Sequence, residues 1–420
     1  MATEWVEREA RPISLRQLTV FGRTLTESRL LSSANYVRLE LPTRIAHRLR
    51  NMQTLPYTAL TNRHISQVHE LYYSAFERLR KVPEVRTLDD NQVLCAAIRE
   101  TLNEHLSVIP ALAMGVLEIR STVTPEVCDK LMTTMLRSRI SRRVIAEQHL
   151  ALTETFHNPP EKKSGSGGAD DDFVGQVLLK CSASQIITSC AKNITRLVRR
   201  AYGPSVSIPR VVQEGDLDST FPYIPSHIEY IIGELLRNSI QASILRGRSE
   251  GPNSVYSSAD PPPIDVLVCE AQEHLIIRVS DQAGGVDGDV LPYLWSFARG
   301  PRRDKRLKNL ERVPRLAGTA QEVAVPPSIP PEDKPPAQES STSTMSENER
   351  YPSSLSSITA RPPDLRLGIG LPISRIYAEY WAGSLELHSL EGYGTDAFLQ
   401  VSKLGNRNEV LSTRASMDAL

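Results

Sequence analysis

GELLRNSIQAS, residues 233–243, decides the fold because it holds two polar side chains one helical turn apart, Glu234 and Asn238, inside an apolar helical pattern. At 100° per residue, one face holds Ile228, Ile231, Ile232, Leu235 and Ala242, and Glu234, Asn238 and Gln241 cluster about 100° away from it. This polar group is either a solvated helix shoulder or part of a site. In a site, an amide oxygen can bind Mg²⁺ together with substrate phosphates, and a carboxylate can accept a proton from a nucleophile.

Composition limits the class of protein. The chain has 420 residues, enough for two or three domains, and its 49 basic residues balance 49 acidic ones. This balance argues against a nucleic-acid-binding protein. The five cysteines are far apart and form no metal-ligand or disulfide pattern, which favours a reducing compartment. No apolar run reaches the ~18 residues of a membrane span, so we expect no membrane association.

Three compositions divide the chain. Residues 11–160 carry apolar side chains at helical spacing and predict an antiparallel helical bundle. Residues 161–173, EKKSGSGGADDDF, interrupt this periodicity and predict a flexible linker. Residues 174–404 contain helices and two β-rich pairs, PIDVLVCEAQEHLIIRVSD and GSLELHSLEGYGTDAFLQVSKL. That order predicts an α+β domain with a mainly antiparallel or mixed sheet and helices on one face.

A fourth composition lies inside the α+β domain. Residues 301–363 hold 11 of the 29 prolines, many serines and charges, and one aromatic residue. Such a stretch cannot bury enough apolar surface to offset the entropy of ordering it, so we expect a disordered insertion.

Three further motifs could join Glu234 and Asn238 in one site. Asp281 ends a predicted strand directly before a glycine turn that includes Gly285, where a carboxylate could accept a hydrogen bond from the exocyclic amine of adenine. Gly368 and Gly370 precede a predicted helix, where free backbone N–H groups favour a phosphate. Thr395 lies in the turn of the last hairpin. Each motif alone is compatible with ordinary turn chemistry.

The order of these four motifs resembles the ATPase fold that histidine kinases share with ninety-kilodalton heat-shock chaperones, type II topoisomerases and mismatch-repair proteins. The resemblance covers residues 205–403. In that fold the segment between the Asp-Gly turn and the Gly-x-Gly helix is a mobile lid over ATP, and the predicted insertion lies there. A histidine kinase also needs a phospho-accepting histidine, and the sequence around His149 does not have that pattern, so we interpret His149 as structural.

The helical half narrows the family. ISLRQLTVFGR, ANYVRLELPTRIAHRLRNMQTLP, HISQVHELYYSAFERL and SRISRRVIAEQHLAL resemble, in that order, the helical domain of the mitochondrial protein kinases. These are pyruvate dehydrogenase kinase and branched-chain 2-oxoacid dehydrogenase kinase. GIGLPISRIYAEYWAGSLELHSLEGYGTD extends the resemblance to nearly the whole chain.

The resemblance implies a role for each motif. Glu234 would be the general base toward a substrate serine, and Asn238 the Mg²⁺ ligand. The remaining residues would bind ATP: Asp281 and Thr395 at adenine, and Gly285, Gly368, Gly370 and Leu371 around the triphosphate. In the helical bundle, three residues match those that line a regulatory 2-oxoacid pocket: His105, Arg139 and Arg143.

It also implies partners and a location. The partners would be the E1α subunit and the E2 lipoyl domain of a 2-oxoacid dehydrogenase complex, together with a second copy of the chain in a homodimer. The location would be the mitochondrial matrix, although the first residues, with Glu4, Glu7 and Glu9, do not resemble an Arg-rich import sequence. The expected activity is inactivation of pyruvate dehydrogenase by serine phosphorylation.

The sequence leaves two alternatives open. Tyr230 and the run after residue 377 look more like the branched-chain enzyme. A non-catalytic nucleotide-sensing adaptor is the second alternative, because the chain departs from the family pattern at several positions. These are Ala283 where a glycine is usual, Arg366 in the lid loop, and Arg237 and Gln241 on the Asn238 helix.

Overall fold

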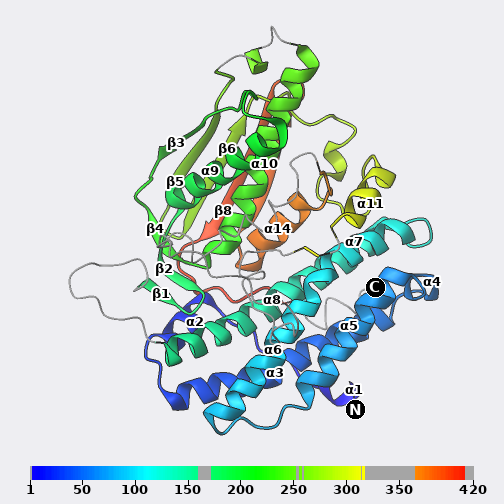
Figure 1. Ribbon diagram of the computed structural model, residues 1–420, viewed down its shortest axis with the longest axis vertical. Coiled ribbons are helices and arrows are strands. Elements are labelled where there is room, and N and C mark those ends of the chain that lie inside the picture. Colours follow the sequence, from blue (N-terminus) through cyan, green and yellow to red (C-terminus); the bar gives the residue numbers. More distant parts are fainter. Residues whose placement is uncertain are drawn as a thin grey trace, which may run out of the picture.

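The computed structural model of the protein describes residues 2–158, 172–251, 255–257, 260–313, 315–316 and 365–411. The first half of the chain is helical, and the second half is built around a β-sheet (Figure 1). The helices of the first half are α1 (Ala2–Glu7), α2 (Leu15–Gly22), α3 (Glu27–Gln53), α4 (Tyr57–Leu60), α5 (Arg63–Arg80), α6 (Leu88–Glu104), α7 (Val108–Ile119) and α8 (Pro125–His157), with a short 3-10 helix η1 (His105–Ser107) between α6 and α7.

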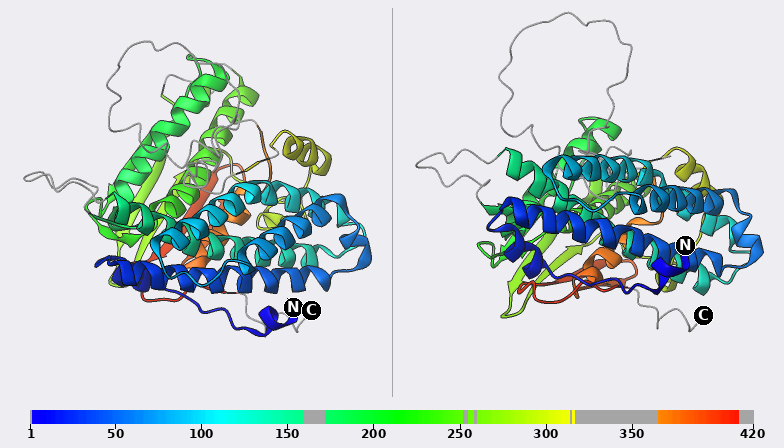
Figure 2. Two further views of the ribbon diagram at one scale, coloured as in Figure 1. Left: turned by 60° about the horizontal axis from the view of Figure 1, so that its bottom comes forward. Right: turned by 90° about the horizontal axis from the view of Figure 1, so that it is seen from below.

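The long helices of the first half form a bundle, in which the blue-to-cyan helices lie side by side (Figure 2). The apolar stripe of α5 explains why it joins the bundle: Ile65, Val68, Tyr72, Phe76 and Leu79 are all buried. Helix α8 begins at Pro125 after the N-cap residue Thr124, as proline at the first helical position predicts.

Residues Leu88–Ile119, which cover α6, η1 and α7, contain an 18-residue stretch that is apolar enough for a membrane-spanning helix, with a mean hydropathy of 1.2. However, 78% of the most apolar stretch is buried inside the protein. A core helix of a bundle has the same composition. The apolarity of this stretch is therefore accounted for by its packing in the core.

The second half is an α+β domain, as predicted. A five-stranded sheet has the order β3-β5-β6-β8-β7, in which only β3 and β5 are parallel. Both predicted hairpins form, and three long helices cover one face of the sheet (Figure 1). The strands of this sheet are β3 (Val211–Gly215), β5 (Ile264–Glu270), β6 (His274–Asp281), β7 (Ser384–Leu390) and β8 (Gly394–Ser402). The covering helices are α9 (Ala183–Tyr202), α10 (Pro225–Glu250) and α14 (Gly370–Tyr380).

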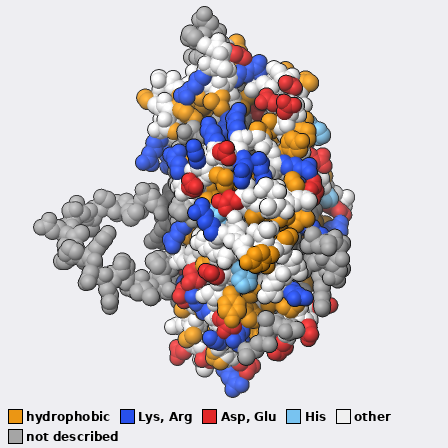
Figure 3. All heavy atoms as spheres, turned by 90° about the vertical axis from the view of Figure 1, so that its right-hand side faces the viewer, with side chains coloured by type: hydrophobic (Ala, Val, Ile, Leu, Met, Phe, Trp, Pro, Cys, Tyr) orange, Lys and Arg blue, Asp and Glu red, His pale blue; other side chains and the backbone are white. Residues whose placement is uncertain are grey.

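A small second sheet was not predicted. It joins β1 (Phe173–Val174), β2 (Val177–Ser182) and β4 (Thr220–Tyr223) in an antiparallel arrangement. Strands β1 and β2 form a tight hairpin, but β1 has only two residues and gives no strand pattern, and β4 comes from a separate part of the chain. On the face drawn in Figure 3, basic, acidic and hydrophobic side chains are interspersed.

The range predicted as a disordered insertion needs a correction at its start. Arg303–Glu311 forms helix α11, which packs on α7 and buries Leu310. Arg303 Nε donates to Leu117 O at 2.9 Å, and Leu316 N donates to Leu106 O at 3.0 Å. Docking on the helical bundle orders this helix, which its composition alone would not predict. Residues 314 and 317–364, and most of the predicted linker (159–171), lie outside the described residues.

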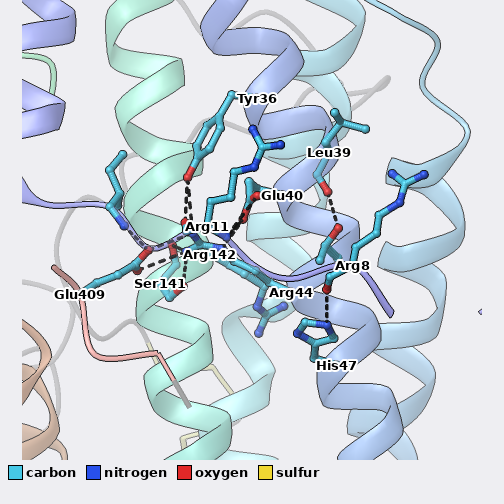
Figure 4. A network of polar contacts seen from close by, with 12 residues as sticks. Arg8, Arg11, Tyr36, Leu39, Glu40, Arg44, His47, Ser141, Arg142 and Glu409 are labelled. Carbon is cyan, nitrogen blue, oxygen red and sulfur yellow. Dashed lines mark hydrogen bonds and ion pairs between the residues drawn. The ribbon is translucent and has the colours of Figure 1, made fainter. Parts of the chain in front are cut away.

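A buried ion pair connects the two halves (Figure 4). Arg44 of α3 pairs with Glu409 of the C-terminal segment at 2.9 Å, with side-chain exposures of 2% and 0%, and with Glu40 at 3.1 Å. Glu409 also accepts hydrogen bonds from Ile13 N at 3.1 Å and from the hydroxyl of Tyr380, at the end of α14. Burial opposes the charge on Arg44, but Glu409 and other anionic neighbours raise the pKa of Arg44 above its ordinary value.

We predict that Glu409→Gln destabilises the protein by about 3–5 kcal/mol, because it leaves the buried Arg44 without its main counter-charge. Urea unfolding would measure the free-energy difference. Glu4→Gln is the matched control, since Glu4 forms an ion pair with Arg8 but is 69% exposed. Equal stability of the two variants would contradict the prediction.

Candidate active site

Helix α10 is buried along almost its whole central part. Between Ser226 and Ile244, Asn238 is its only exposed residue. Glu234 and Gln241, which share a helix face with Asn238, are only 3% and 6% exposed. The interpretation as a solvated helix shoulder therefore fails for Glu234 and Gln241. The helix reaches the surface at Asn238, one turn after a buried carboxylate.

The Glu234 carboxylate lies at the beginning of α14. A Cβ atom at Gly370, the first residue of α14, would overlap Oε2 of Glu234. Arg237 Nε lies 3.8 Å from Oε1 of Glu234. The positive end of the α14 dipole favours a carboxylate at this place. Gly370 thus has a steric reason to be glycine: the acid occupies the space that a side chain would need.

Asp281 and Thr395, both predicted adenine contacts, are brought together by strand register. They face each other directly in the β6–β8 pairing. Oδ2 of Asp281 accepts hydrogen bonds from Thr395 Oγ1 and Ser239 Oγ, each at 2.6 Å, and Oδ1 accepts one from Ala283 N at 3.0 Å. Asp281 is 7% exposed. Three donors fix the position of this carboxylate at the end of its strand.

The turn after Asp281 requires glycine at two positions. Gly284 and Gly285 have φ of 100° and 75°, a region that residues with a side chain rarely adopt. A Cβ atom at Gly285 would also overlap Leu390 O in the β7–β8 turn. Ala283, which departs from the family pattern, has no such backbone conformation. The alanine is therefore accommodated without backbone strain.

The segment before α14 is held by two side chains of α11. Gly368 has φ of 69°, and a Cβ atom there would lie 2.5 Å from Arg306 Nε. Arg306 donates to Gly368 O at 3.2 Å, and Asn309 Nδ2 donates to Arg366 O at 2.8 Å. Leu371, the second residue of α14, is half-buried. The backbone of Arg366, another departure from the family pattern, is thus part of an ordered contact.

The structure adds two residues to the predicted set. Ser239 follows Asn238 directly and donates to Asp281. Gly394 precedes Thr395, and a Cβ atom at Gly394 would overlap Asp281 O. Sequence reasoning passed over both, although each adjoins a predicted site residue. Since α10 contacts α14 and β6, and β8 contacts β6 and α14, the four predicted segments come together at one place.

A second group of predicted residues lines a cavity in the helical bundle. His105, Arg139 and Arg143 surround a space of about 20 Å³, which Arg142 also lines. The ring of His105 stacks on Tyr72, with centroids 5.2 Å apart, and Arg142 Nη2 donates to Tyr72 Oη at 2.6 Å. The structure thus brings all three predicted regulatory residues together.

The cavity is lined by several arginines. Burial lowers the pKa of His105 well below its usual range, and the nearby Arg142, Arg139 and Arg143 lower it further, so His105 is neutral at physiological pH. Burial also lowers the pKa of Arg142. Arg143 pairs with Glu147 at 2.6 Å. Such surroundings are suited to a small anion.

His149 is structural, as interpreted from the sequence. Its ring is fully buried, with Nδ1 3.1 Å from Ser33 Oγ and Nε2 2.9 Å from Asn91 Oδ1. Burial lowers the pKa of His149 to about 4. With both ring nitrogens occupied, His149 offers no nucleophile to a phosphoryl group.

Together, fold and site define a class of two-part proteins. A helical bundle with a cavity suited to an anion is joined to an α+β domain in which a buried acid, an exposed amide and glycine turns lie close together.

Comparison with known proteins identifies the family. The family model described as mitochondrial branched-chain alpha-ketoacid dehydrogenase kinase matches residues 12–177.

Full-length relatives agree with this match. The chain is 32% identical to "[Pyruvate dehydrogenase (acetyl-transferring)] kinase 2, mitochondrial" of Saccharomyces cerevisiae, over 97% of this chain and 84% of the relative. It is 30% identical to a mitochondrial pyruvate dehydrogenase kinase of Arabidopsis thaliana, over 95% and 92% of the two chains. The chain belongs to the family of mitochondrial pyruvate dehydrogenase and branched-chain 2-oxoacid dehydrogenase kinases.

We predict that Gly370→Ala displaces the Glu234 carboxylate and costs about 1–3 kcal/mol of stability through overpacking. Gly288→Ala is the control, since its Cβ atom would meet only Glu391 Oε2, at 3.4 Å. Thermal unfolding of both variants would measure the difference. A Gly370→Ala protein as stable as the control, with Glu234 unmoved in a crystal structure, would refute this steric argument.

Proposed function

We propose that this protein is a mitochondrial serine kinase that uses Mg-ATP to phosphorylate the E1α subunit of the pyruvate dehydrogenase complex, and thereby inactivates it. The observation that carries the proposal is the meeting of the buried Glu234 with the beginning of α14, one turn before the exposed Asn238. The relatives named as pyruvate dehydrogenase kinases support the choice of substrate.

The nucleotide would lie between α10, the end of β6 and the beginning of α14. Asp281 would accept a hydrogen bond from the adenine amine, with Thr395 beside it, because both are fixed at the end of the β6–β8 pair. Gly285, Gly368, Gly370 and Leu371 would surround the triphosphate. The backbone N–H groups at the start of α14 suit an anionic ligand.

The residues present fit a magnesium ion that is shared with the nucleotide. Mg²⁺ usually takes one or two protein oxygens and completes its shell with waters and phosphates. The described residues contain no group of three or more His, Cys, Asp or Glu side chains that could hold a metal by themselves. Asn238, with its amide at the surface, would supply the protein oxygen, and Mg²⁺ would neutralise charge on the phosphates.

Glu234 would act on the substrate serine. It is buried, so water competes little for it, and it lies where α14 begins, next to the proposed place of the triphosphate. It would accept the serine proton as the oxygen attacks the γ-phosphorus and the bond from that phosphorus to the β,γ-bridging oxygen breaks, releasing ADP, while the chain holds the two reactants in line. Arg237, close to Glu234, keeps a positive charge beside the acid.

The second candidate substrate is the branched-chain 2-oxoacid dehydrogenase complex. The family model that matches residues 12–177 is named for the branched-chain kinase, which favours this candidate for the helical half. In either case the chain would associate with the dehydrogenase complex. We propose E1α and the E2 lipoyl domain as its direct partners there, and a homodimer as the assembled form.

The cavity in the bundle is a candidate regulatory site for a 2-oxoacid. A carboxylate there would meet Arg139, Arg142 and Arg143, and burial would strengthen the attraction. The present 20 Å³ accommodates about one water molecule, so a 2-oxoacid would require side chains to move apart. Binding of the effector would thereby change the packing of the bundle helices.

Two variants separate catalysis from nucleotide binding. We predict that Glu234→Gln keeps ATP affinity but lowers phosphoryl transfer about 10²–10⁴-fold, because only the general base is lost. Asp281→Asn should weaken ATP binding about 10–100-fold, because a charged acceptor is removed. The assay is transfer from labelled ATP to purified E1α of each complex, together with calorimetric ATP titration.

Two controls accompany this experiment: Glu250→Gln at the far end of α10 and Asp265→Ala on the neighbouring strand β5. Full activity of Glu234→Gln would refute its role as base. ATP binding without any transfer by the wild-type protein would favour the non-catalytic adaptor. The preferred E1α decides between the two complexes.

For the cavity, we predict that pyruvate or a branched-chain 2-oxoacid binds the wild-type protein and that Arg139→Met weakens this binding about 10–100-fold, the loss expected for a charged hydrogen bond. Calorimetric titration would measure the affinity. Arg86→Met, which removes a 78% exposed arginine, is the control for charge alone. Equal affinity in both variants would exclude the cavity as the binding site.

A further inference from the structure

Arg306, on α11, binds two distant parts of the chain at once. Its side chain is 8% exposed and donates to four carbonyl oxygens: Phe297 at 2.8 Å, Arg299 at 3.1 Å, Leu367 at 3.3 Å and Gly368 at 3.2 Å. The first two carbonyls follow the turn that begins at Asp281. The last two precede α14. One guanidinium therefore links the segment between β6 and α11 to the segment that leads into α14.

Two neighbouring contacts strengthen this arrangement. Asn309, one turn after Arg306, donates to Arg366 O at 2.8 Å. On the other segment, Asp129 of α8 accepts hydrogen bonds from Phe297 N at 2.7 Å and Ala298 N at 3.0 Å. Arg306 thus lies between a segment anchored on the helical bundle and the segment that leads into α14.

The contact with Gly368 is close. A Cβ atom at Gly368 would lie 2.5 Å from Nε of Arg306, and the backbone at Gly368 has φ of 69°. The guanidinium therefore lies directly against the turn, and its hydrogen bonds hold the turn in a conformation that only glycine adopts easily. That turn sets the direction in which α14 begins.

The charge of Arg306 is not offset by a carboxylate within hydrogen-bond distance among the described residues. Burial lowers the pKa of Arg306 to about 10, and Arg120 lowers it as well, while Asp129 acts in the opposite direction. Arg306 therefore remains charged at physiological pH, and its positive charge lies beside Gly368. A nearby triphosphate would compensate that charge.

We propose that Arg306 is a positioning residue for the triphosphate: it holds the Gly368–Gly370 turn so that the first N–H groups of α14 face the phosphates, and it adds a buried positive charge behind them. This inference rests on the proposed function. Arg306 would therefore strengthen the binding of the phosphates of ATP but not the binding of its adenosine part.

The test compares two ligands on three variants. Calorimetric titration with ATP and with adenosine is carried out on full-length wild type, Arg306→Met, Arg306→Lys and the control Lys308→Met, an exposed position on the same helix. We expect Arg306→Met to lose at least tenfold in ATP affinity and less than twofold in adenosine affinity. Arg306→Lys, which keeps the charge but cannot span both segments, should lose an intermediate amount. Lys308→Met should match the wild type.

Each outcome decides a definite point. Equal losses for ATP and adenosine, or no loss at all in Arg306→Met, would overturn the positioning role while leaving the proposed function intact. If Arg306→Met fails to fold, Arg306→Lys decides by the same ratio of ATP loss to adenosine loss. Failure of the wild-type protein to bind ATP would overturn the proposed function, and this inference with it.

Discussion

The packing of α10 against α14 is the constraint on which the site depends. Glu234 and Gly370 occupy neighbouring space so closely that only a residue without a side chain fits at position 370. This contact keeps the carboxylate buried at the positive end of a helix, where the helix dipole favours an acid. One turn later, Asn238 reaches the surface. The proximity of a dry acid and an accessible amide follows from the path of one helix.

Helix α14 also connects the helical bundle to the site. It begins at Gly370 and ends at Tyr380, whose hydroxyl donates to Glu409, the carboxylate that pairs with Arg44. Its Glu379 pairs with Arg137 of α8 at 2.9 Å. Both ends of the helix are therefore held, one by the site and the other by buried charges of the bundle. Helices α3 and α8 are thus both connected to the end of α14.

The sequence predicted the local parts of this structure well and the long-range contacts poorly. The α+β class, both hairpins and the helix of Glu234 follow from periodicity, which is a property of neighbouring residues. The pairing of Arg44 with Glu409 has no such signature, because the two residues are 365 positions apart. Helix α11 was not predicted for a related reason. Leu310 and Arg306 stabilise it through contacts with other parts of the chain, and such contacts cannot be predicted from the composition of the segment.

Three buried arginines differ in how far neighbouring groups compensate their charge. Arg44 has a raised pKa, since carboxylates outweigh the effect of burial. Arg142 and Arg306 have lowered pKa values, because burial dominates and their hydrogen-bond partners are a tyrosine and backbone carbonyls. A buried cation without a carboxylate gains most from an anionic ligand. Arg142 lines the cavity proposed for a 2-oxoacid, and Arg306 adjoins the turn proposed for the triphosphate. Both of these arginines thus lie where the proposed function requires an anion.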